Sequence, residues 1–99
     1  MSKYRRAAKI DANQPDIVAD LRKIPGVTVE VNHDDILCGY KGQTFWFEIK
    51  EPETVSNVTG EVQPSKIKPS QYDLLETWTG HYRIVWRIEQ ILEDMGIEK

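Results

Sequence analysis

The chain has 99 residues, of which 39% are hydrophobic and 29% charged, a composition typical of one soluble globular domain with a single core. It has no apolar run near the roughly 20 residues that a membrane helix needs, no secretory signal is expected, and its one cysteine excludes an internal disulfide. The net charge of −3 argues against a protein that simply coats nucleic acid, and the cytoplasm is the expected compartment.

The N-terminal part predicts a basic arm followed by a helix. Residues 1–10 are expected to be a flexible arm, either solvated or touching phosphates, and residues 11–99 a single domain. The basic side chains of the arm are Lys3, Arg5, Arg6 and Lys9. The helix is expected to be capped by Asp11 or Asn13 and to end before Pro25-Gly26.

Alternating apolar residues then predict three strands. The first covers residues 27–31, and the next two, 36–40 and 43–50, form a hairpin around the turn Lys41-Gly42. Cys38 lies within this hairpin, where a small buried hydrophobe is expected rather than a reactive thiol. Residues 51–68 form a long loop, which is either a solvated linker or a substrate-gripping element that uses Lys66 and Lys68.

The last third predicts a helix, a strand and a second helix. The first helix begins at Pro69 and ends at Thr79-Gly80, and the strand covers residues 82–86. The residues expected to form the apolar face of that helix are Tyr72, Leu74, Leu75 and Trp78. Those expected on the apolar face of the final helix are Ile88, Ile91, Leu92 and Met95. The order α-β-β-β-α-β-α indicates an α/β fold with a mixed sheet flanked by helices.

Charged residues gather at the open end of the hairpin. If Lys41-Gly42 is a two-residue turn, Asp35 faces Glu48 across the strands, and Lys50 shares their sheet face. Opposed carboxylates repel, so either a divalent cation offsets them or Lys50 does so in a surface ion cluster. A longer loop at the turn would shift the register and separate the acids.

Several segments of the chain, in this order, resemble the PD-(D/E)XK nuclease superfamily, and in particular its small phage and bacterial VRR-NUC-like group. The resembling segments are residues 11–18, 35–42, 47–50, 68–71, 77–80, 84–85 and Glu89. The resemblance implies a restriction-endonuclease-like core and a metal-dependent endonuclease acting on DNA in a bacterial or phage-infected cell. Two positions depart from the family pattern: Asp34 stands where the family has Pro, and Asp16 where it has Glu.

The resemblance also implies roles for individual residues and for partners. Asp35, Glu48, the Ile49 carbonyl and Asp16 would hold Mg²⁺ or Mn²⁺. Lys50 would position the attacking water, and Gln71 would orient Lys50 or that water. Expected partners are DNA, a second copy of the chain in a homodimer, and phage or host replication and recombination proteins.

Each of these roles has a plainer alternative. Asp16 also fits as a favourable charge at a helix N-terminus, and Gln71 as an ordinary residue of a first helical turn. Trp46 shares the face of the acid pair, where it either packs beneath the site or stacks on a base. Trp78 and Trp86 are expected in the core. His33 and His81 are too few and too scattered for a zinc site.

Three functions follow from this pattern. The first is a structure-selective endonuclease for branched or four-way-junction DNA, and the second is a nuclease subunit that needs a targeting partner. The third is a non-catalytic DNA-binding or assembly module with a nuclease fold. The chain offers no room for a separate targeting domain, which favours dimerisation or a partner.

Overall fold

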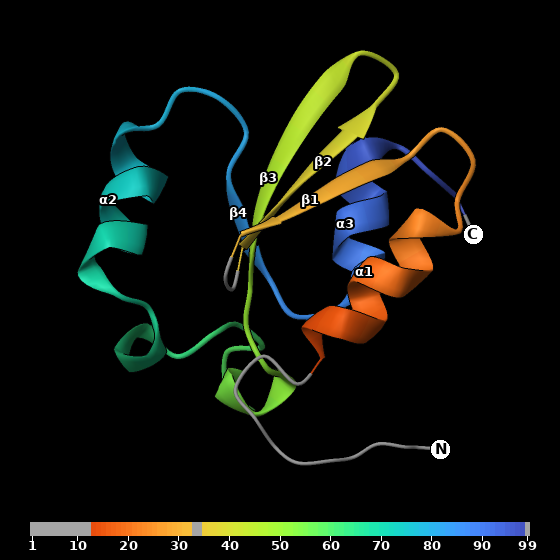
Figure 1. Cartoon of the computed structure of the whole chain (residues 1–99). Helices are drawn as coiled ribbons and strands as arrows, with labels where there is room; N and C mark the ends of the chain where they lie inside the picture. Colours follow the sequence, from red (N-terminus) through yellow and green to blue (C-terminus); the bar gives the residue numbers. More distant parts are fainter. Residues whose placement is uncertain (1–12, 33–34, 99) are drawn as a thin grey trace.

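The computed structural model describes residues 13–32 and 35–98, which follow the predicted order α-β-β-β-α-β-α (Figure 1). The helices are α1 (Gln14–Arg22), α2 (Pro69–Thr77) and α3 (Ile88–Met95). The strands are β1 (Thr28–Asn32), β2 (Asp35–Tyr40), β3 (Gln43–Ile49) and β4 (Arg83–Val85). The basic arm with Arg5 and Arg6, the cap candidate Asp11, and His33 and Asp34 lie outside the described residues.

The four strands form one mixed sheet in the order β1-β2-β3-β4. The first three run antiparallel, and β4 pairs parallel with β3. The β2–β3 register confirms the two-residue turn, because Tyr40 faces Gln43 at one end and Asp35 faces Glu48 at the other. Lys41 and Gly42 have φ of 52° and 78°, the two positive values that a type I′ turn requires, and glycine adopts its value without strain.

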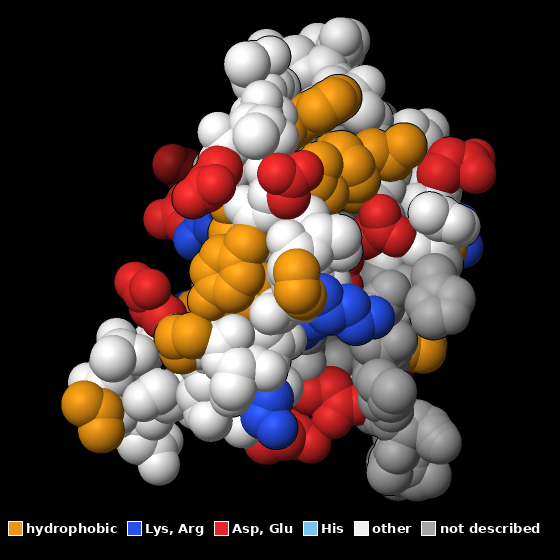
Figure 2. Space-filling model, turned by 90° about the vertical axis from the view of Figure 1, so that its left-hand side faces the viewer, with side chains coloured by type: hydrophobic (Ala, Val, Ile, Leu, Met, Phe, Trp, Pro, Cys, Tyr) orange, Lys and Arg blue, Asp and Glu red, His pale blue; other side chains and the backbone are white. Residues whose placement is uncertain are grey.

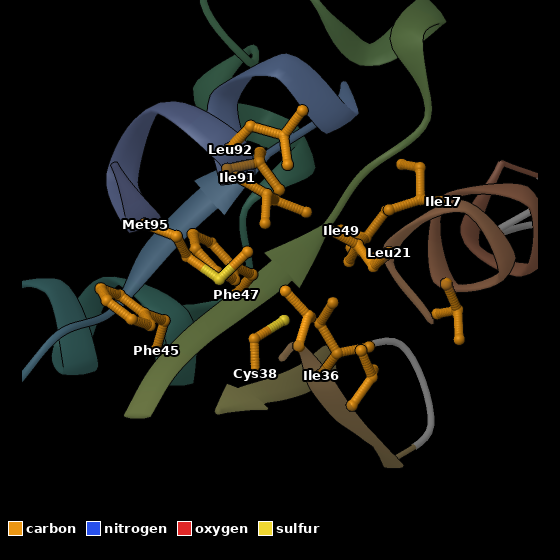
Figure 3. Close-up of a cluster of buried hydrophobic side chains, with 14 residues drawn as sticks. Ile17, Leu21, Ile36, Cys38, Phe45, Phe47, Ile49, Ile91, Leu92 and Met95 are labelled. Carbon is orange, nitrogen blue, oxygen red and sulfur yellow. The ribbon is translucent and has the colours of Figure 1, made fainter. Parts of the chain in front are cut away.

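One face of the sheet carries the hydrophobic core (Figure 3). Phe45, Phe47 and Ile49 project from β3 on this face as the alternation predicts, and Ile36 and Cys38 project from β2. The residues that α1 and α3 place against them include Ile17, Leu21, Ile91, Leu92 and Met95. Cys38 is fully buried, and this burial raises the pKa of its thiol to about 11, as fits an unreactive core residue.

Helix α2 is the element whose packing the sequence predicts wrongly. It lies on the other side of the sheet from α1 and α3 (Figure 1), and Gln71 is its only buried residue. Tyr72, Leu75 and Trp78 are 41%, 46% and 50% exposed, so they do not form a core-facing stripe, and Trp78 is not a core residue. Trp86 is half-buried rather than fully buried. Helical spacing correctly shows which residues share a face, but not whether another element covers that face.

The segment between β3 and α2 is more ordered than a plain loop. It contains two short 3-10 helices, η1 (Pro52–Thr54) and η2 (Pro64–Lys66). Val55 and Val62 pair in an isolated antiparallel bridge, and Val62 is buried. No helix among residues 13–32 and 35–98 is long and apolar enough to cross a membrane.

Candidate active site

The acid pair stands on the sheet face opposite the core. Asp35 is the first residue of β2 and lies directly across from Glu48 of β3, as the turn predicts. Their neighbours Ile36 and Phe47 point into the core, so alternation turns both carboxylates to the other face. Glu48 is only 5% exposed, whereas Asp35 is half-buried. Two acids held this close on one face cost folding free energy unless a positive group offsets them.

Lys50 directly follows β3 and remains paired with β4. Its backbone N–H donates to the carbonyl of Val85 at 2.8 Å, which extends the β3–β4 pairing by one residue. Alternation therefore places the Lys50 side chain on the same face as Glu48, and the residue is half-buried. Between them, Ile49 points its side chain into the core and is 1% exposed. The structure thus groups Asp35, Glu48 and Lys50 at one end of one face.

Asn13 fastens the start of α1 to this end of the sheet. It occupies the cap position before α1, but its side chain makes no cap hydrogen bond. Its amide instead donates to the carbonyl of Lys50 at 3.0 Å and to that of Trp86 at 3.4 Å. The expected capping role is therefore wrong for Asn13, because the side chain is used to tie three segments together next to Lys50.

Asp16 does not join the acid pair in a shared group. It lies in the first turn of α1 and is exposed, because the helix buries Gln14, Ile17, Val18 and Leu21 instead. Among residues 13–32 and 35–98, no three side chains of His, Cys, Asp and Glu lie close enough to hold a metal ion. Asp16 does occupy the helix N-terminus, where negative charge is favourable.

Gln71 is buried at the start of α2, where it has a structural task. Its side-chain oxygen accepts a hydrogen bond from the backbone N–H of Lys68 at 2.9 Å, so it closes the first turn of the helix. This is the first-turn alternative that the sequence left open for Gln71. Lys66 and Lys68 are both exposed at the end of η2 and just before α2, where they are accessible to a polyanion.

Trp46 binds the carboxylate of Asp35, a contact that the sequence did not predict. Its indole N–H donates to Oδ2 of Asp35 at 2.7 Å, while its ring lies edge-on to Trp78 and Tyr82 at centroid distances of 5.4 and 4.9 Å. The register could have suggested the contact, because Trp46 shares the face of Asp35 and lies two residues before Glu48.

His81 connects Trp46 to the last turn of α3. Its Nδ1 accepts a hydrogen bond from the backbone N–H of Trp46 at 3.0 Å, so the neutral ring carries its proton on Nε2, which donates to Asp94 at 2.8 Å. Arg83 pairs with the same Asp94. No sequence signal brings these residues together, since Trp46 and His81 are 35 positions apart.

The donors grouped here are chemically suited to a hard divalent cation. Carboxylate oxygens from Asp35 and Glu48, with the backbone carbonyl of Ile49 next to Glu48, are the ligand type that Mg²⁺ and Mn²⁺ prefer. Mg²⁺ keeps several waters and is often held by only one or two carboxylates, so a third acid is not required. Comparison with protein-family models, curated proteins and solved structures finds no match to this chain, so a function has to rest on these residues and their geometry.

Proposed function

We propose that this protein is a metal-dependent endonuclease that hydrolyses phosphodiester bonds in DNA. The observation that carries the proposal is the direct opposition of Asp35 and Glu48 on the sheet face away from the core, with Lys50 two residues beyond Glu48. Glu48 is buried and Asp35 half-buried, and because opposed carboxylates repel, a cation held between them would stabilise this end of the sheet. The resemblance of the hairpin to the PD-(D/E)XK pattern points to the same chemistry.

The proposed roles combine the positions of Asp35, Glu48 and Lys50 with what the resemblance implies for the other residues. Asp35 and Glu48 would hold Mg²⁺ or Mn²⁺, with the Ile49 carbonyl as a further ligand and Asp16 as a ligand that acts directly or through water. A divalent cation, when bound, activates water as a nucleophile and offsets negative charge on the phosphate. Lys50 orients the attacking water and stabilises the charge that grows on the phosphate oxygens in the transition state. Water adds across the P–O bond, leaving a phosphate on one end and a hydroxyl on the other.

Other side chains hold these groups in place. Trp46 donates its indole N–H to one oxygen of Asp35 and so would orient this carboxylate for binding a cation. Asn13 keeps the end of β3 beside the start of α1. Five further residues are proposed to contact the DNA or the attacking water: Gln71, Lys66, Lys68, Arg5 and Arg6. The side chain of Gln71 has less freedom to do so, because its oxygen accepts a hydrogen bond from the Lys68 backbone.

A non-catalytic DNA-binding or assembly module is the second candidate. The exposure of Asp16 favours it, because the carboxylates do not form a three-acid group among the described residues. A nuclease subunit that acts only with a partner is a variant of the first candidate. Dimerisation and contact with replication or recombination proteins belong to the same proposal.

A cleavage assay separates the candidates. The protein is incubated with labelled duplex, single strand, splayed fork and four-way junction, in Mg²⁺, Mn²⁺ or EDTA. Lys50→Ala and Glu48→Gln are compared with Lys23→Ala and Asp20→Asn, which change exposed charges on and just after α1. We expect metal-dependent cutting that is lost in the first two variants and kept in the controls. Binding without cutting, in either metal, would favour the non-catalytic module.

A further inference from the structure

The open face of the sheet contains a cavity directly beside the acid pair. It has a volume of about 340 Å³ and lies between β1, β2, β3 and the end of α2. The residues that line it include the apolar Leu37, Trp46 and Trp78 and the polar Glu30, Asn32 and Asp35. Asp35 is thus shared between the cavity and the proposed metal site. Figure 2, which looks onto the side of the molecule that carries α2, shows hydrophobic side chains at the surface with acidic and basic ones next to them.

Trp78 is exposed but held in a defined position. It is 50% exposed, and its ring meets that of Trp46 edge-on, with centroids 5.4 Å apart and planes at 89°. On another side it lies close to Gly80, where an added Cβ would stand 2.9 Å from the indole nitrogen. Because Gly80 has no side chain, the indole of Trp78 has room to pack against it. An aromatic ring that is fixed and still half exposed loses little conformational entropy when a flat ligand stacks on it.

The negative charge of the cavity wall favours a base over a phosphate as the part of a nucleic acid that binds there. Glu30 and Asp35 bring carboxylates to its wall, and none of the described residues that line it is Lys or Arg. A phosphate would be repelled there, whereas a neutral planar ring suits the two indoles and Leu37. The carboxylates and the Asn32 amide can accept hydrogen bonds from the amino and imino groups of a base. The imino group and the face of a base are available only when the base is unpaired and unstacked.

We propose that this cavity binds one unpaired nucleobase next to the phosphate to be cut, with Trp78 as its stacking surface. The inference rests on the proposed function, because the strand that fills the cavity is the strand held at Asp35. It names the substrate class: DNA with a single-stranded stretch at the cut site, in place of continuous duplex. Trp78 acts as a specificity-determining residue and does not contact the reacting atoms.

The first experiment measures binding without cutting. A labelled oligothymidine and an abasic strand of equal length, which has the same phosphates but no bases, are titrated with protein in EDTA by fluorescence anisotropy. Base–aromatic stacking of the usual strength predicts that Trp78→Ala weakens binding of oligothymidine about fivefold to a hundredfold. Binding of the abasic strand stays unchanged, and Trp78→Phe retains most of the affinity. Trp86→Phe, at a half-buried indole that does not line this cavity, is the matched control.

A second variant moves the ring without removing it. Gly80→Ala places a methyl group 2.9 Å from the Trp78 indole nitrogen, which is too close, so the ring must shift and we expect a loss between those of Trp78→Phe and Trp78→Ala. Circular dichroism and thermal unfolding show whether each variant folds. Equal weakening of both strands in Trp78→Ala, or of neither, overturns the proposal. A change in sedimentation of Trp78→Ala without DNA also overturns it, because the exposed ring would then belong to a contact between two copies of the chain.

Cleavage then tells this inference apart from the proposed function. With Mg²⁺, wild-type protein should cut a fork or flap faster than continuous duplex, and Trp78→Ala should lose this preference while it still cuts. If no substrate is cut, the proposed function fails, while the anisotropy result still decides whether the cavity binds a base. If cutting occurs with equal rates on duplex and fork, the proposed function stands and the inference fails.

Discussion

The two faces of the sheet are made from alternate residues of the same strands, but one is covered by helices and apolar, whereas the other carries polar and partly exposed side chains. Under α1 and α3, Phe47, Ile36 and Cys38 are almost completely buried in one continuous hydrophobic cluster. On the other face, the next residues along are Asp35, Trp46 and Glu48, and α2 leaves much of its own apolar surface exposed. The contrast indicates that stability comes mainly from the closed face, and that the open face is available for binding and chemistry.

A core truncation should have the largest effect and should act through stability. Phe47→Ala removes a fully buried ring from the closed face, which we expect to cost about 3–5 kcal/mol of unfolding free energy. Leu37→Ala, on the open face at 44% exposure, should cost about 1 kcal/mol or less. Urea unfolding followed by circular dichroism measures both. Similar losses in the two variants would mean that the faces do not differ as described.

Truncation of Lys50 should have the opposite effect to truncation of Phe47: the activity is lost and the stability is kept. Lys50→Ala deletes the charge that is proposed to stabilise the transition state, for which losses of about 10²–10³-fold in rate are usual. Its backbone bond to Val85 remains, so the urea midpoint should stay near that of wild-type protein. Single-turnover cleavage measures the rate, with Lys23→Ala as the exposed-lysine control. Undiminished cleavage in Lys50→Ala would remove that residue from the mechanism.

Removal of the hydrogen bond from Trp46 to Asp35 should lower metal affinity, with a smaller effect than the loss of rate in Lys50→Ala. Trp46→Phe keeps an aromatic ring but loses the indole donor 2.7 Å from Asp35. Partners that orient a metal ligand in this way are typically worth about tenfold to a hundredfold in affinity or activity. Isothermal titration with Mn²⁺ measures the change against Trp86→Phe. Equal Mn²⁺ affinity in the two variants would show that the indole does not position Asp35.

The smallest effect concerns pH and the one thiol of the closed face. Burial raises the pKa of Cys38 from 9.0 to about 11 in the folded protein, so the thiol stays protonated to a higher pH in the folded state than in the unfolded state. The stability that this protonated thiol contributes is complete below pH 9 and is lost as pH rises through about 11. At pH 8 a thiol reagent should label Cys38 slowly in buffer and quickly in urea. Fast labelling of the folded protein would place Cys38 outside the core.

The closed face could be predicted from the sequence because its information is local. Lys41-Gly42 supplies both positive φ values of the turn, and strict alternation through Phe45, Phe47 and Ile49 fixes which side chains point inward. The turn and the alternation also determine that Asp35 meets Glu48. A single register therefore gives both the core of the hairpin and the acid pair.

The rest of the open face could not be predicted, because its contacts join distant parts of the chain. Helical spacing groups Tyr72, Leu75 and Trp78, but it does not reveal that nothing in the described chain buries them fully. The Asn13–Lys50 bond spans 37 positions, and it takes an amide whose local context predicts a helix cap. Such contacts depend on where α1 begins and where β3 and β4 end in space, which no short motif encodes.

The most direct test of the account is thermal unfolding of wild-type protein, Glu48→Gln and Asp20→Asn, each with and without Mg²⁺. A cation bound at the acid pair stabilises the folded state, so Mg²⁺ should raise the Tm of wild-type protein and of Asp20→Asn. Glu48→Gln removes one of the two opposed carboxylates, so added Mg²⁺ should leave the Tm of this variant unchanged. An unchanged Tm of wild-type protein in Mg²⁺, or an equal rise in Glu48→Gln, would contradict a metal site at Asp35 and Glu48.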